Sequence, residues 1–120
     1  MRHEPPPPVE IKEVADAIGV EALLSLLEHH AGCRIYIPAT VNQASPLARD
    51  IGLEAAQALA RLKGPDDWKV PSLKNWRARV YSARGMSQHD IARKLGVDRT
   101  TVQRYLNPVP SHLSQMILPL

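Results

Sequence analysis

Two stretches of the chain show the same arrangement of polar and apolar positions. Apolar residues recur three or four positions apart over residues 20–30 and again over 53–63, which predicts two amphipathic helices. The inward-facing stripes are expected to consist of Leu23, Leu24 and Leu27 in the first helix and of Ala55, Leu59 and Leu62 in the second. A shorter helix is predicted before each of them, over about 10–18 and about 46–51, and each short helix ends at a glycine.

These stretches are two copies of one repeat with an offset of 33 residues. Residues 14–38 align with residues 47–71 without a gap, and both copies contain Gly-x-Glu-Ala and end in proline. In each copy a turn and a short strand follow the second helix, over residues 34–37 and 68–70. One copy is too small to bury its apolar stripe or to pair its strand. We therefore expect the copies to pack about a pseudo-two-fold axis with antiparallel strands, as one small α+β unit over residues 10–71.

Residues 73–106 carry a different pattern, which predicts three short helices. These are expected over residues 73–84, 88–95 and 99–106. The expected N-caps are Ser72, Ser87 and Asp98. Between the second and third helices, Gly96 permits a tight left-handed turn, with apolar residues on both sides and a small residue where the helices cross. This combination is specific to a helix-turn-helix.

The predicted fold is therefore mainly helical, with a short two-stranded antiparallel sheet. Residues 1–9 are proline-rich and predict a disordered arm. Residues 10–71 are expected to form the duplicated helix–strand unit, for assembly or dimerisation, and residues 72–106 are expected to form a helix-turn-helix DNA-binding domain. Residues 107–120 begin with helix-breaking prolines and are interpreted as a tail.

The composition is that of a small globular protein. Of the 120 residues, 44% are apolar and 22% are charged, which fits one compact domain or two very small ones. A single cysteine, Cys33, excludes an intrachain disulfide framework and is typical of a reducing compartment. The apolar stretches are far shorter than the about 20 residues of a membrane span, and the N-terminal sequence lacks the apolar core of a secretory signal. We therefore expect a cytoplasmic protein with no membrane partner.

Positive charge is concentrated in the predicted helix-turn-helix. Residues 73–106 contain eight basic and two acidic residues, a net charge of +6, whereas the rest of the chain has a net charge of −3. A basic module beside a mildly acidic one is typical of a nucleic-acid-binding domain joined to a part with another role. The expected partner is double-stranded DNA.

The helix over residues 99–106 is predicted to enter the major groove, as the second helix of this motif does. Its outward-facing side chains, the candidates for reading bases, are Arg99, Thr100, Gln103 and Arg104. The candidates for contacts to phosphate are Thr101, Ser87, Gln88, Arg84, Arg93 and Lys94. By contrast, Arg77 and Arg79 are expected on a solvated face.

The sequence carries little support for catalysis. His29, His30 and Cys33 give three metal ligands at best, and a favourable position near a helix C-terminus explains the histidines better. There is no glycine-rich phosphate loop, no Gly-x-Ser-x-Gly and no pair of catalytic carboxylates. We therefore expect neither an enzyme nor a bound metal or cofactor.

The chain also resembles the Mor family of transcription activators of Mu-like bacteriophages. The residues that carry this resemblance are Ala31-Gly32, Ile35-Tyr36-Ile37-Pro38, Ile91-Ala92-Arg93-Lys94-Leu95 and Thr101-Val102-Gln103-Arg104-Tyr105-Leu106. Members of this family have an N-terminal dimerisation unit of helices and one strand, followed by a helix-turn-helix, and act as dimers that help recruit RNA polymerase. The resemblance implies a phage or prophage activator, with RNA polymerase and a second copy of the chain as partners.

The duplicated repeat departs from this family pattern, which has one helix–strand unit. Copies that pair within one chain would occupy the surface through which the family dimerises. Two other functions fit the same residues. One is an accessory subunit or fragment of a recombinase or transposase, because DNA invertases end in a similar helix-turn-helix. The other is an assembly module whose basic hairpin binds a protein.

Overall fold

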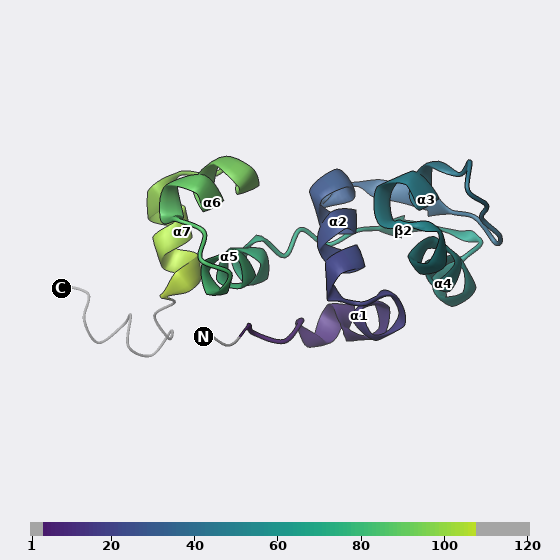
Figure 1. Cartoon of the computed structure of the whole chain (residues 1–120), viewed down its shortest axis with the longest axis horizontal. Coiled ribbons are helices and arrows are strands. Elements are labelled where there is room, and N and C mark those ends of the chain that lie inside the picture. The colour runs from purple at the N-terminus through teal and green to yellow at the C-terminus, as the bar shows by residue number, and fades with distance from the viewer. Residues whose placement is uncertain (1–3, 108–120) are drawn as a thin grey trace, which may run out of the picture. The chain divides into compact units, whose positions relative to one another are not determined.

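A computed structural model describes residues 4–107 of the chain (Figure 1). The predicted tail over residues 107–120 lies outside the described residues except for Asn107. The chain divides into two compact units. One consists of Pro6–Leu73, and the other combines residues 74–107 with Glu4 and Pro5. Within the described residues, no helix is both long and apolar enough to span a membrane.

The first unit contains both copies of the repeat. Its elements are a 3₁₀ helix η1 (Val9–Ile11), the helices α1 (Lys12–Ile18), α2 (Val20–His30), α3 (Pro46–Ile51) and α4 (Leu53–Lys63), and the strands β1 (Arg34–Ile37) and β2 (Asp66–Lys69). The order α1–α2–β1 therefore recurs as α3–α4–β2. The predicted two-stranded antiparallel sheet is confirmed, because β1 pairs with β2.

The register of the sheet follows the repeat. Ile35 lies opposite Trp68, and these two residues occupy the same position in the two copies, 33 residues apart. Arg34 lies opposite Lys69. Backbone hydrogen bonds extend the ladder past its end, because the carbonyl of Cys33 accepts from the N–H of Val70 at 2.9 Å. A pseudo-two-fold axis thus passes between Ile35 and Trp68.

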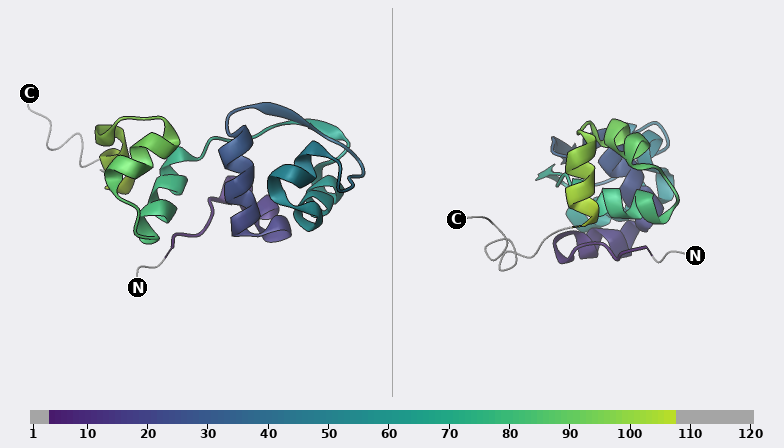
Figure 2. Two further views of the ribbon diagram at one scale, coloured as in Figure 1. Left: turned by 45° about the horizontal axis from the view of Figure 1, so that its top comes forward. Right: turned by 90° about the vertical axis from the view of Figure 1, so that its left-hand side faces the viewer.

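Each copy covers the apolar side of the other. Helix α1 packs against α4, and α3 packs against α2, which is the same contact with the copies exchanged. Figure 2 shows these helices from two further directions. The core consists mainly of residues that occur at matching positions of the two copies, and its fully buried side chains include Leu23, Leu26, Leu27, Ile37, Leu59 and Val70. Burial of apolar surface therefore holds the two copies together.

The glycines between the paired helices have matching conformations. Gly19 has φ 88° and ψ 159°, and Gly52 has φ 92° and ψ 153°. Only glycine adopts this region of φ and ψ without strain. Each glycine ends the shorter helix and begins the longer one, so the sharp change of direction is the same in both copies.

Two details of this unit differ from the sequence expectation. The second strand begins at Asp66 and not at Trp68, because both aspartates pair with β1 although their type favours a turn. The buried positions of α4 are Ala56, Leu59 and Ala60, so Leu59 of the predicted stripe is confirmed, whereas Ala55 and Leu62 are only partly buried. Because β2 pairs with β1 and α4 packs on α1, tertiary contacts, and not local preference, decide both details.

The second unit contains three helices, α5 (Lys74–Ala83), α6 (Gln88–Leu95) and α7 (Arg99–Leu106). Helix α5 contacts both α6 and α7, which also contact each other. The buried apolar side chains of this unit are Trp76, Ala78, Val80, Tyr81, Ile91, Ala92, Leu95 and Val102. The three-helix pattern predicted from the sequence is confirmed, with α5 one residue shorter at each end.

The basic residues of α5 do not lie on a solvated face, contrary to the prediction. Arg77 is only 5% exposed, and its guanidinium donates to the hydroxyl of Tyr81 at 3.5 Å. Arg79 is half-buried, and its Nε donates to the carbonyl of Tyr105 at 3.0 Å. The aliphatic part of an arginine side chain can pack among apolar side chains. A pattern that counts arginine only as polar does not predict such burial.

The described part of the N-terminal arm has defined contacts. The indole Nε1 of Trp76 donates to the carbonyl of Pro5 at 3.1 Å, and Glu4 forms an ion pair with Arg84 at 3.2 Å. Val9 begins the 3₁₀ helix. Residues 4–9 thus differ from the disordered arm that proline content predicted.

Candidate nucleic-acid interface

The candidate interface lies on α6, α7 and the turn that joins them. Helix α6 begins after Ser87, whose hydroxyl accepts from the backbone N–H of Asp90 at 3.1 Å. It ends at Gly96, which has φ 70° and ψ 36° in the left-handed region. The N–H of Val97 then bonds to the carbonyl of Ala92 at 3.0 Å. The predicted cap and the predicted turn glycine are both confirmed, and together they fix where α7 begins.

Helix α7 is capped by Asp98. Its Oδ1 accepts from the backbone N–H of Thr101 at 2.8 Å. Hydrogen bonds from the side chain and backbone of Thr101 lower the pKa of Asp98, and the nearby Arg104 guanidinium adds to this effect. The lowered pKa favours the ionised carboxylate, whose negative charge lies at the positive end of the helix dipole.

Contacts with α5 hold the inner side of α7. Val102 is fully buried, and Arg79 of α5 bonds to the carbonyl of Tyr105 in the last turn of α7. A cationic donor at the carbonyl end of a helix is favourable for the same electrostatic reason as the carboxylate at its start. Helix α7 is thus fixed at both ends, and its orientation relative to α6 is defined.

The outer side of α7 carries exposed polar side chains. All four predicted base-reading residues are exposed, namely Arg99, Thr100, Gln103 and Arg104. Thr101 is half-buried, and its hydroxyl accepts from Arg104 at 3.2 Å. Gln88, at the start of α6, lies beside this face, because its Oε1 accepts from Arg99 at 3.4 Å and from Gln103 at 3.3 Å. The structure therefore brings Gln88, Arg99 and Gln103 together as one polar surface.

A helix-turn-helix family model matches residues 73–116. The matched segment contains α5, α6 and α7, so the chain has a C-terminal helix-turn-helix domain. Comparisons with curated proteins and with solved structures gave no match. The helix-turn-helix domain supports a DNA-binding regulator, and nothing in these comparisons points to the Mor family or to a phage.

The other predicted phosphate contacts come from the end of α5 and from α6. Arg84 follows α5 and is paired with Glu4. Lys94 lies over the ring of Tyr81, with its Nζ 5.4 Å from the ring centroid. Arg93 and Ser87 are exposed, the first in the last turn of α6 and the second at its N-cap. A role in contacting phosphate stays a prediction for these residues.

Sequence reasoning missed two contacts of the helix-turn-helix domain. Arg79 bonds to the end of α7, 26 residues further along the chain, and the carbonyl of Pro5 accepts from Trp76 of α5, 71 residues further along. Neither contact leaves a local pattern in one sequence, because each depends on tertiary packing. Among the described residues, no group of histidine, cysteine, aspartate and glutamate side chains is arranged to hold a metal ion.

Proposed function

We propose that this protein is a sequence-specific transcription regulator that reads the major groove of double-stranded DNA with α7. The single observation that carries the proposal is the exposed polar side of α7, held at both ends by Asp98 and Arg79 within a helix-turn-helix domain. Helix α7 has eight residues, a length that fits a recognition helix lying in the major groove.

The side chains on this surface have the chemistry that base reading requires. The guanidinium groups of Arg99 and Arg104 can donate two hydrogen bonds to guanine, and the amide of Gln103 can pair with adenine. The methyl group of Thr100 can contact thymine. Each good bidentate pair contributes about 1–3 kcal/mol of discrimination between bases. Gln88 and Thr101 lie in the first turns of α6 and α7. Because backbone N–H groups at a helix start bind phosphate, these two residues are the proposed contacts to the DNA backbone.

Activation is the proposed mode of regulation, by contact with RNA polymerase. Its support is the resemblance to the Mor family, carried by Ala31-Gly32 and Ile35-Tyr36-Ile37-Pro38 in the first unit and by residues 91–95 and 101–106 in the second. A reporter gene placed behind the selected DNA site tests this point. Higher expression when the full chain is present supports activation, and lower expression contradicts it.

The experiment that tests DNA reading starts with selection of duplexes from a random pool by the full chain. Affinity is then measured for the selected duplex and for a scrambled duplex of the same composition, at several salt concentrations. We expect binding of both to weaken as salt rises, because phosphate contacts release counterions. We expect the selected duplex to bind at least tenfold more tightly at every salt concentration.

Two matched variants locate the reading surface. Arg104→Ala and Arg49→Ala remove the same charge, and Arg49 is an exposed residue of α3 in the other unit. Arg104→Ala should reduce the preference for the selected duplex about 5- to 150-fold, as the loss of one bidentate contact predicts. Arg49→Ala should leave the preference unchanged. Equal loss for both variants contradicts the proposed role of α7, and strand cleavage by the purified chain would favour a recombinase.

A further inference from the structure

We propose that this protein reads DNA as a single chain, with one recognition helix on a site that lacks two-fold symmetry. Its duplicated repeat completes within one chain the pairing that a single copy would have to make with a second chain. The proposal rests on the DNA-binding function proposed above, and it adds the symmetry of the DNA site and the number of chains bound to it.

The pairing of the two strands is self-complementary. Exchange of the two copies moves Arg34 to the position of Asp67 and Tyr36 to the position of Lys69. The pair Arg34–Lys69 thus takes the place of the pair Asp67–Tyr36, and the register is unchanged. A register that maps onto itself in this way is the one that two identical subunits adopt across a two-fold interface.

The helices show the same self-complementary arrangement. Helix α1 of the first copy packs on α4 of the second, and α3 of the second copy packs on α2 of the first. Leu26 and Leu59 are repeat mates, and both are completely buried. The apolar surface that would otherwise drive two chains to associate is therefore already covered inside one chain.

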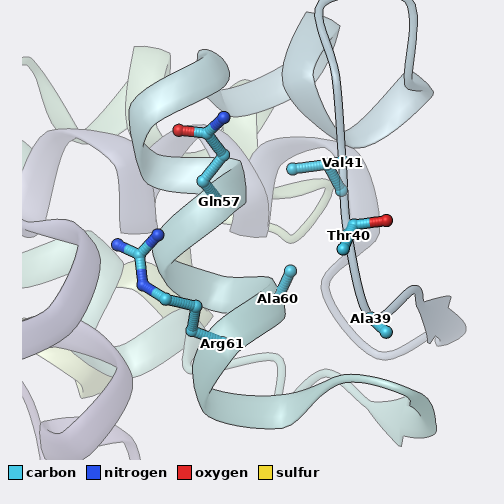
Figure 3. Close-up of a pocket in the computed structure, with 6 residues that line it drawn as sticks. All are labelled: Ala39, Thr40, Val41, Gln57, Ala60 and Arg61. Atoms are coloured by element: carbon cyan, nitrogen blue, oxygen red, sulfur yellow. The ribbon is translucent and has the colours of Figure 1, made fainter.

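The chain leaves the two strands differently. Pro38 and Pro71 are repeat mates, each placed just after its strand. After Pro71 the chain continues into the helix-turn-helix domain, whereas after Pro38 it continues through a loop into α3. Figure 3 shows part of this loop beside α4, with Val41 and Ala60 labelled. The two residues line a hollow of about 270 Å³. A second DNA-reading domain would have to follow Pro38, but the segment after Pro38 is the loop that connects the first copy to the second.

These observations determine the expected geometry on DNA. Dimeric helix-turn-helix proteins read two half-sites about one helical turn apart, because a two-fold axis relates their two recognition helices. In this chain, the axis relates the two copies of the repeat, and the described residues supply one recognition helix for both copies. The selected DNA should therefore contain one short recognition element and no inverted repeat.

The closed pairing is tested first, without DNA. Light scattering should give a mass of 13.3 kDa, that of a single chain, across a wide range of protein concentrations. For a direct test of the strand pairing, Tyr36→Cys and Asp67→Cys are combined with Cys33→Ser. Tyr36 and Asp67 lie directly opposite each other, where Cα atoms are about 4.5–5.5 Å apart, within reach of a disulfide.

Oxidation of this double-cysteine chain should give an intrachain disulfide at the mass of one chain. Covalent dimers would overturn the proposal, because they would show that the copies pair between chains. If the variant does not fold, the mass of the unmodified chain still decides, and a stable dimer of the full chain overturns the proposal. The variant with Tyr36→Cys and Cys33→Ser alone is the control for random oxidation.

The number of chains on DNA is tested with the duplex selected by the full chain. We expect a non-palindromic sequence and a complex whose mass corresponds to one chain per duplex. An inverted repeat that binds two chains overturns the proposal. Failure to select any sequence would instead contradict the DNA-binding function itself, while the mass and disulfide measurements would still report on the closed pairing.

Discussion

Asp98 and Thr101 form the cap of the recognition helix, with the carboxylate Oδ1 2.8 Å from the backbone nitrogen. Hydrogen bonds from Thr101 lower the pKa of Asp98 below its ordinary value of 3.8. A lowered native pKa stabilises the fold above the unfolded-state pKa, and this contribution is lost as the pH falls through the native pKa. The cap should therefore weaken only in acid, below about pH 4.

Asp98→Asn tests this dependence, because asparagine is an equally good N-cap that does not titrate. We expect the variant to be slightly less stable than the wild type in urea unfolding at neutral pH, because it keeps the cap but loses the favourable charge at the helix start. From about pH 5 to pH 2 its stability should fall less steeply than that of the wild type. Parallel stability curves over this range would show that Asp98 makes no pH-dependent contribution.

The hydroxyl of Ser87 should stabilise the start of α6. Ser87→Ala removes the acceptor for the N–H of Asp90 and should lower the free energy of unfolding by about 1 kcal/mol. Ser87→Thr should retain most of the stability, since threonine also caps helices. Ser72→Ala is the matched control and should have little effect, because Ser72 is exposed and α5 begins at Lys74, so the predicted capping role of Ser72 is wrong. Equal losses for Ser72→Ala and Ser87→Ala would contradict the capping role.

Gly96 should be required for its backbone conformation and not for space. Its φ is 70°, and a Cβ built there meets no heavy atom within 4 Å. Gly96→Asn should therefore cost little, whereas Gly96→Val should cost more than 1–2 kcal/mol, roughly the penalty for an ordinary residue in the left-handed region. Chemical unfolding of both variants measures this difference. A stable Gly96→Val variant would place the turn elsewhere.

Gly64 presents the opposite case, in which space decides. Its φ of −84° suits any residue, but a Cβ there would collide with the carbonyl of Pro38 and lie 2.8 Å from the carbonyl of Ala60. Gly64→Ala should therefore destabilise the N-terminal unit by about 1–3 kcal/mol, the usual cost of overpacking. Gly32→Asn is the control, because Gly32 has open space and a positive φ that asparagine tolerates. A smaller loss for Gly64→Ala than for Gly32→Asn would contradict this close approach.

Much of the fold is determined by interactions between residues close together in the sequence, and these features were predictable from the sequence. Ser87, Gly96 and Asp98 act through hydrogen bonds or backbone angles within a few residues. Their residue types therefore indicate where the helices begin and end. The repeat has the same advantage, since Gly19 and Gly52 mark equivalent changes of direction. Pairing of the strands then follows from the need of each copy for a partner.

What the sequence did not predict depends on distant contacts. Asp66 is part of a strand because its backbone pairs with β1. Arg79 is half-buried because its side chain bonds to a carbonyl at the end of α7. In the candidate interface, exposure of the side chains of α7 was predictable from helical periodicity. The position of Gln88 beside Arg99 and Gln103 was not, because it depends on how α6 and α7 pack.

The central claim, that the outer side of α7 reads DNA, is tested most directly by nuclear magnetic resonance. The ¹⁵N-labelled full chain is titrated with the duplex that it selects, and the change in each amide and side-chain signal is recorded. The account predicts the largest changes at Gln88, Arg99, Thr100, Gln103 and Arg104, and small changes over α1 to α4. Large changes confined to the N-terminal unit, with the signals of α7 unmoved, would contradict it.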